Sequence, residues 1–79
     1  MTNREKYNEA FMDSLDVKEE ELEGLEYESI PAWDSVGHMT LVDAIETAFD
    51  ISLETDDVVG LNSYKEGINI LKKYDITIE

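Results

Sequence analysis

The chain has 79 residues, a formal net charge of −14, 42% hydrophobic residues and no cysteine. This composition suits one small folded domain over residues 1–79, and the lack of cysteine excludes disulfides and cysteine-ligated zinc. The polar N-terminus and short apolar runs argue against a secretory signal or a membrane span, so we expect a soluble, cytoplasmic protein.

A first helix is predicted over residues 3–15. Thr2 and Glu5 have the spacing of a capping box at its start. Apolar residues then recur every fourth position on one face, at Tyr7, Phe11 and Leu15.

A long connection, residues 16–33, follows this helix and is interrupted by Gly24 and Pro31. Pro31 favours an extended conformation at the residue before it, so no helix should run through this point. Loops of this length are uncommon in compact domains and often carry function.

Three further helices are predicted after the connection. Asp34 is a good N-cap for a helix that begins at Ser35 and ends near Asp50. A short helix should be capped by Thr55 and closed at Gly60, and the spacing of Ser63 and Glu66 predicts a fourth helix with another capping box. The tail, residues 75–79, alternates like a strand but is too short to pair. We therefore expect an all-α fold, a small four-helix bundle with three main helices, a short third one and a long first loop.

The charge is unevenly distributed along the chain. All six Lys and Arg residues lie near the ends, while residues 19–64 hold thirteen carboxylates and no Lys or Arg. Such a field repels nucleic acid and anionic lipid and attracts basic protein surfaces. It also keeps a small protein soluble, and charge alone favours neither role.

Ser35 and His38 raise the hypothesis of a hydrolase, because residues at i and i+3 share a helix face. No residue is spaced to orient the His, the G-x-S-x-G elbow is missing, and so small a domain hardly encloses a pocket. We therefore expect no catalytic residue and no enzyme, with His38 on the helix surface.

Alternating oxygen-bearing residues over 50–56 resemble the beginning of a calcium loop. Thr55 stands where such a loop needs Gly, and Leu61 stands where it needs the closing acid. No metal site is expected.

Asp34 and Ser35 leave two interpretations open. Both are good residues for a helix start, which explains them without any function. A phosphate ester on Ser35 would be favoured by the helix N-terminus, although the Asp34 carboxylate partly opposes it.

The stretch "WDSVGHM" followed by "TLVDAIETAFDI" resembles the acyl carrier protein family, and "LDV", "FDI", the Asp-rich third helix and "SYKEGINIL" follow the same order. The resemblance implies that Ser35 carries 4'-phosphopantetheine, added from coenzyme A by a separate phosphopantetheinyl transferase, with Asp34 as the preceding acid. An acyl or aminoacyl group would then be held as a thioester. It would be loaded by a ligase or acyltransferase and passed to downstream biosynthetic enzymes by a monomeric carrier.

The family also implies a surface that recognises basic patches on these partners. Its candidates here are two apolar residues and six carboxylates: Val36, Met39, Asp43, Glu46, Asp50, Glu54, Asp56 and Asp57.

Several positions depart from carriers of primary fatty acid synthesis. Acidic residues common in those carriers are replaced by Gly37, Thr40, Thr47 and Ala48. These departures favour a free-standing carrier of a specialised pathway. The alternative is a small acidic interaction module, such as a nucleic-acid mimic or an inhibitor of a basic protein, in which Ser35 only starts a helix.

Overall fold

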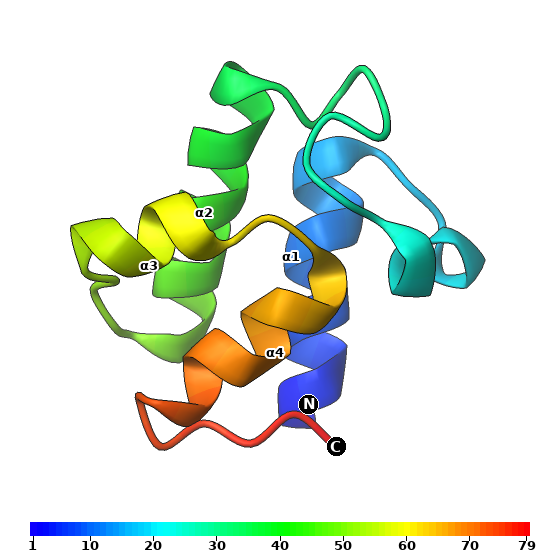
Figure 1. The fold of residues 1–79 in the computed structure, drawn as a ribbon. Coiled ribbons are helices and arrows are strands. Elements are labelled where there is room, and N and C mark those ends of the chain that lie inside the picture. The colour runs from blue at the N-terminus through cyan, green and yellow to red at the C-terminus, as the bar shows by residue number, and fades with distance from the viewer.

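A computed structural model describes residues 1–79, and all of its regular elements are helices. They are α1 (Asn3–Leu15), the 3₁₀ helix η1 (Glu19–Gly24), α2 (Ser35–Phe49), α3 (Thr55–Gly60) and α4 (Tyr64–Lys72). Helices α1 and α2 pack against each other, α4 crosses in front of them, and α3 lies to one side (Figure 1). The prediction of an all-helical chain is confirmed.

The helix starts follow the capping signals at three of four places. At α1 the full capping box forms, with Thr2 and Glu5 each bonded to the other's backbone N–H. Asp34 caps α2, and the Ser63 hydroxyl accepts from a backbone N–H in the first turn of α4. Each such side-chain cap is worth about 1 kcal/mol.

The predicted cap of α3 is wrong. Glu54 is the N-cap, without a side-chain hydrogen bond, and Thr55 is the first helical residue. A tertiary contact accounts for this start, because the Glu54 N–H donates to the Tyr74 hydroxyl at 3.0 Å and so fixes the chain one residue earlier.

The connection between α1 and α2 contains η1, which the sequence did not reveal. Leu22 and Leu25 are buried and attach this segment to the core. At the other end of the chain, the tail forms no strand, as expected, and Ile78 is buried. The tail lies against the start of α1, where the Asn3 side chain donates to the Thr77 carbonyl at 3.2 Å (Figure 1).

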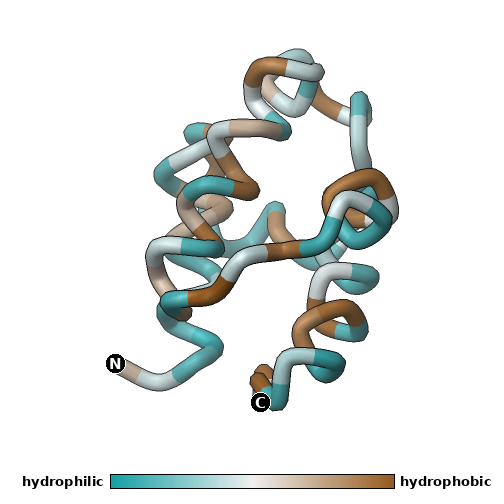
Figure 2. The backbone as a smooth tube through the Cα atoms, turned by 90° about the vertical axis from the view of Figure 1, so that its left-hand side faces the viewer, coloured by the Kyte–Doolittle hydropathy of each residue, from teal (hydrophilic) through white to brown (hydrophobic).

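The core is centred on aromatic rings from three parts of the chain. Phe11 of α1 lies 5.2 Å from Tyr64 of α4 and 5.6 Å from Trp33 of the connection, between ring centroids. The Tyr7 hydroxyl, also buried, donates to the Tyr64 carbonyl at 2.6 Å, and burial raises the pKa of Tyr7. Apolar (brown) and polar (teal) residues are interspersed along the backbone (Figure 2). The core therefore ties the loop before α2 to both α1 and α4.

No helix has both the length and the apolar character that crossing a membrane requires.

Candidate functional site

The site is built at the first turn of α2. The Asp34 side chain accepts from the Gly37 N–H at 2.9 Å, so Asp34 supplies the helix cap. Ser35 follows as the first helical residue and is exposed. The capping role proposed for this pair thus belongs to Asp34, which leaves the Ser35 hydroxyl without a structural task.

The N–H groups of Ser35 and Val36 have no acceptor within the chain. Unpaired N–H groups at a helix start carry partial positive charge and favour anions. The Ser35 hydroxyl lies 3.4 Å from the hydroxyl of Tyr27, which comes from the preceding connection. The first turn of α2 therefore has the donors that a phosphate ester on Ser35 requires.

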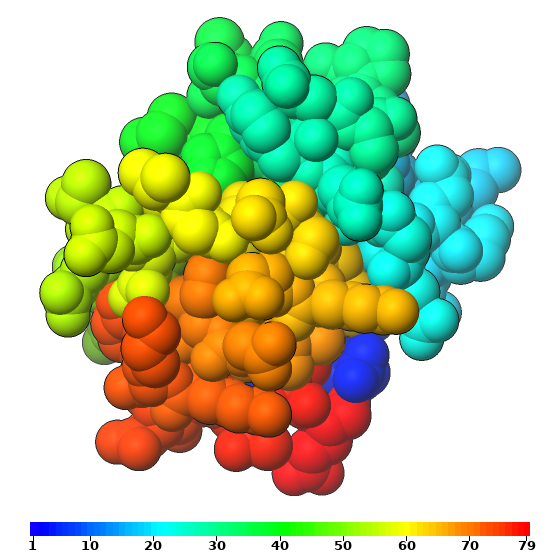
Figure 3. All heavy atoms as spheres, in the orientation of Figure 1, coloured from blue at the N-terminus to red at the C-terminus, as the bar shows by residue number.

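The segment before Ser35 is fixed rather than loosely attached. Tyr27 donates its backbone N–H to Asn62 at 2.8 Å, and Tyr64 donates its own to Leu25 at 3.0 Å. These two bonds attach the segment between α1 and α2 to the short segment between α3 and α4. In the space-filling view the same segment, in teal, lies against the green start of α2 (Figure 3).

His38 is half-buried and does not lie free on the helix surface, so that expectation is wrong. Its Nδ1 accepts from the indole N–H of Trp33 at 3.0 Å. A ring nitrogen that accepts leaves the proton on the other one, so Nε2 donates to the Val58 carbonyl at 2.7 Å. His38 therefore links the buried Trp33, α2 and α3.

The Ser35–His38 pair of a hydrolase does not form. Both ring nitrogens of His38 are bonded elsewhere, and the only side-chain partner of Ser35 is Tyr27. No group of three or more acidic or His side chains is placed to hold a metal ion. The larger surface hollows lie around Arg4 and between α1 and α2, and Ser35 lines none of them.

The structure gives a steric reason for glycine at position 37. A Cβ atom built on Gly37 would lie 1.9 Å from the Ala32 carbonyl oxygen, which belongs to the backbone. Any side chain at this position would push the connection away from α2. The glycine at this position is thus coupled to the close packing in front of Ser35.

The two apolar recognition candidates are well exposed. Val36 is 76% and Met39 58% exposed, and both lie in the first two turns of α2. Val59 in α3, which sequence reasoning did not single out, is also 76% exposed. Val36 and Met39 are three residues apart and so share one face of α2, and adjoining exposed apolar residues are candidates for contact with another protein.

The six candidate carboxylates differ in exposure, and two of them, Glu46 and Asp57, are bonded within the chain. Four are exposed: Asp43, Asp50, Glu54 and Asp56. The Glu46 carboxylate is half-buried and accepts from the Leu53 N–H at 2.7 Å, so it stabilises the turn after α2.

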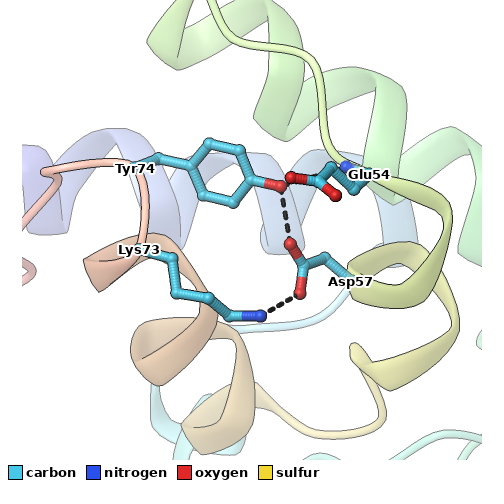
Figure 4. Close-up of polar contacts among 4 residues, drawn as sticks. All are labelled: Glu54, Asp57, Lys73 and Tyr74. Atoms are coloured by element: carbon cyan, nitrogen blue, oxygen red, sulfur yellow. Dashed lines mark hydrogen bonds and ion pairs between the residues drawn. The ribbon is translucent and has the colours of Figure 1, made fainter.

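Asp57 differs from the rest because it is only 6% exposed. Its carboxylate receives the Lys73 ammonium group at 2.5 Å and the Tyr74 hydroxyl at 2.6 Å (Figure 4). These bonds hold α3 to the end of α4. The structure therefore gives Asp57 a stabilising task in place of the partner contact expected for it, because its charge is already neutralised within the chain.

Replacing Asp57 with Asn is expected to destabilise the protein at neutral pH. The hydrogen bonds from Lys73 and Tyr74 hold the pKa of Asp57 below its ordinary value of 3.8. A carboxyl group whose pKa is lower in the folded than in the unfolded state stabilises the protein at any pH above its unfolded-state pKa. This stabilisation is lost as the pH falls through the folded-state pKa. The difference from wild type should thus shrink as pH falls below 3.8 and through the lowered folded-state pKa, measured by urea unfolding across pH. Asp56→Asn, an exposed neighbour, should show little difference at any pH.

No protein-family model matches the chain, and comparisons with curated proteins and with solved structures likewise find no match.

Proposed function

We propose that this protein is a carrier that holds an acyl or aminoacyl group as a thioester on a 4'-phosphopantetheine arm attached to Ser35. The observation that carries the proposal is the Ser35 hydroxyl, which is exposed at the first residue of α2 and freed from capping by Asp34. The unpaired N–H groups of Ser35 and Val36 lie at the same helix end and suit a phosphate.

In this proposal the chain supplies an attachment oxygen and a fixed position but no catalytic group. The Ser35 oxygen forms the new ester bond to phosphorus while the pyrophosphate bond of coenzyme A breaks on a separate transferase. Adenosine bisphosphate leaves, and the hydroxyl proton passes to the transferase. The arm brings the thiol that a chain without cysteine lacks, and an acyl thioester on it is activated for transfer. The four α-helices would then serve as a small bundle that presents Ser35.

Partners would meet the chain around the start of α2 and along α3. The exposed Val36 and Met39 offer apolar contact, and the exposed carboxylates offer charge for basic patches. Such patches raise association rates in a salt-dependent way. We assign this role to the transferase, the loading ligase or acyltransferase and the downstream enzymes, with the chain as a cytoplasmic monomer in a specialised pathway.

Ser35→Ala is expected to abolish attachment of the arm. Wild type, Ser35→Ala and the matched control Ser52→Ala, whose serine is exposed in the loop before α3, would be incubated with coenzyme A, Mg²⁺ and a broad-specificity phosphopantetheinyl transferase. Intact mass should show one added arm on wild type and on Ser52→Ala, and none on Ser35→Ala.

Two results would contradict the proposal: no addition to wild type, or undiminished addition to Ser35→Ala. The acidic interaction module remains the competing function. It would be favoured by tight, salt-sensitive binding to a basic protein that needs no arm and survives Ser35→Ala.

A further inference from the structure

Tyr27 occupies an unusual place for an aromatic residue. Its side chain is 36% exposed, yet its ring is held edge-on against Trp33 and His38, at centroid distances of 6.3 and 5.5 Å. Its backbone N–H is bonded to Asn62. The ring is therefore fixed on two sides, and its hydroxyl lies beside Ser35.

The Tyr27–Ser35 contact is weak as it stands. The two hydroxyl oxygens are 3.4 Å apart, whereas a good O–H···O bond measures about 2.7–2.8 Å. A contact of this length contributes little to the stability of the unmodified chain. A rigidly placed hydroxyl with so weak a partner is available for a better acceptor.

We propose that Tyr27 is a positioning residue whose hydroxyl donates a hydrogen bond to the phosphate group on Ser35. This inference rests on the proposed attachment of the arm. The free phosphate oxygens are two bonds from the Ser35 oxygen, through phosphorus, so a hydroxyl that already reaches that oxygen also comes within reach of them. A bond to an anionic phosphate oxygen is shorter and about twice as strong as one between neutral hydroxyls.

The surrounding residues make a neutral donor important. Residues 19–64 contain no Lys or Arg, so no cation from this part of the sequence pairs with the phosphate. The Asp34 carboxylate is bonded to the Gly37 N–H, and His38 has both nitrogens engaged. The Tyr27 hydroxyl and the free N–H groups at the start of α2 are the donors that remain. Tyr27 thus sets the direction in which the arm leaves the protein surface.

The test compares ³¹P NMR spectra of modified wild type, Tyr27→Phe and Tyr74→Phe. Phenylalanine keeps the ring between Trp33 and His38 and removes only the hydroxyl. Tyr74→Phe is the matched control, because its hydroxyl bonds Asp57 at a different place. We expect the phosphodiester resonance of Tyr27→Phe to shift and to narrow, since the phosphate gains mobility, while Tyr74→Phe retains the wild-type signal. An unchanged shift and line width in Tyr27→Phe would overturn the proposal.

Wild type provides a second test that needs no variant. Nuclear Overhauser contacts between the Tyr27 ring protons and the first protons of the arm are expected, and their absence would also overturn it. Intact mass measured beforehand separates the two hypotheses. If wild type takes up no arm, the proposed function fails and this inference fails with it. If all three chains are loaded and the spectra coincide, only the role of Tyr27 fails.

Discussion

Trp33→Ala is expected to lower the free energy of unfolding by about 3–5 kcal/mol, as for other large aromatic residues removed from a core. Trp33 is fully buried, packs edge-on against Phe11, and donates its indole N–H to His38. A chain of this length has roughly 4–12 kcal/mol of stability in total. The variant should therefore lose a large share of its stability and unfold at a clearly lower urea concentration than wild type, as measured by urea titration followed by far-UV circular dichroism.

Two further variants define the cause of this loss. Trp33→Phe keeps a ring against Phe11 but leaves His38 Nδ1 without its donor, so we expect an intermediate loss of about 2 kcal/mol. Val59→Ala, at an exposed apolar position, should change stability by less than about 0.5 kcal/mol. A Trp33→Ala protein as stable as wild type would contradict the central place given to Trp33.

Gly37→Ala is expected to lower the free energy of unfolding by about 2 kcal/mol. The added Cβ would lie 1.9 Å from the Ala32 carbonyl oxygen, and a backbone atom cannot rotate away as a side chain can. Overpacking of this kind costs about 1–3 kcal/mol, and the better helix propensity of Ala offsets about 1 kcal/mol at most. Because the displaced segment carries Tyr27 and Trp33, the fluorescence of Trp33, the only tryptophan, should change as well.

Gly60→Ala is the matched control for this substitution. Gly60 also lies in a helix, but its Cβ would meet only the end of the Ile70 side chain, at 3.9 Å. Here Ala should be neutral or stabilise by less than about 1 kcal/mol, because Gly60 is the last residue of α3 and Ala mainly reduces the conformational freedom of the unfolded chain. Equal stability of the Gly37 and Gly60 variants would show that the connection does not pack against α2 as described.

Local signals in the sequence predicted most of the helices. The pair Thr2 and Glu5, and the caps Asp34 and Ser63, each act within one turn, so their spacing is readable without the fold. Helix η1 could not be predicted in this way, because a short 3₁₀ helix lacks the 3.6-residue period. Its only apolar residue, Leu22, gives no pattern.

The parts of the site that sequence reasoning missed depend on contacts between distant segments. His38 was placed on the surface because nothing local indicates its bonds to Trp33 and Val58. Asp57 looked like one more exposed acid, and only the packing of α3 against the end of α4 brings Lys73 to it. One usable signal was the single Trp beside Asp34, since a lone large aromatic residue in an acidic loop needs a buried place.

The central claim is that Ser35 carries an arm with cargo, and mass spectrometry of the protein isolated from its own cells tests it most directly. We expect the peptide that contains Ser35 to carry phosphopantetheine with an acyl or aminoacyl group attached. Hydroxylamine, which cleaves thioesters, should remove the cargo and leave the arm. A protein isolated entirely with an unmodified Ser35 would contradict the account.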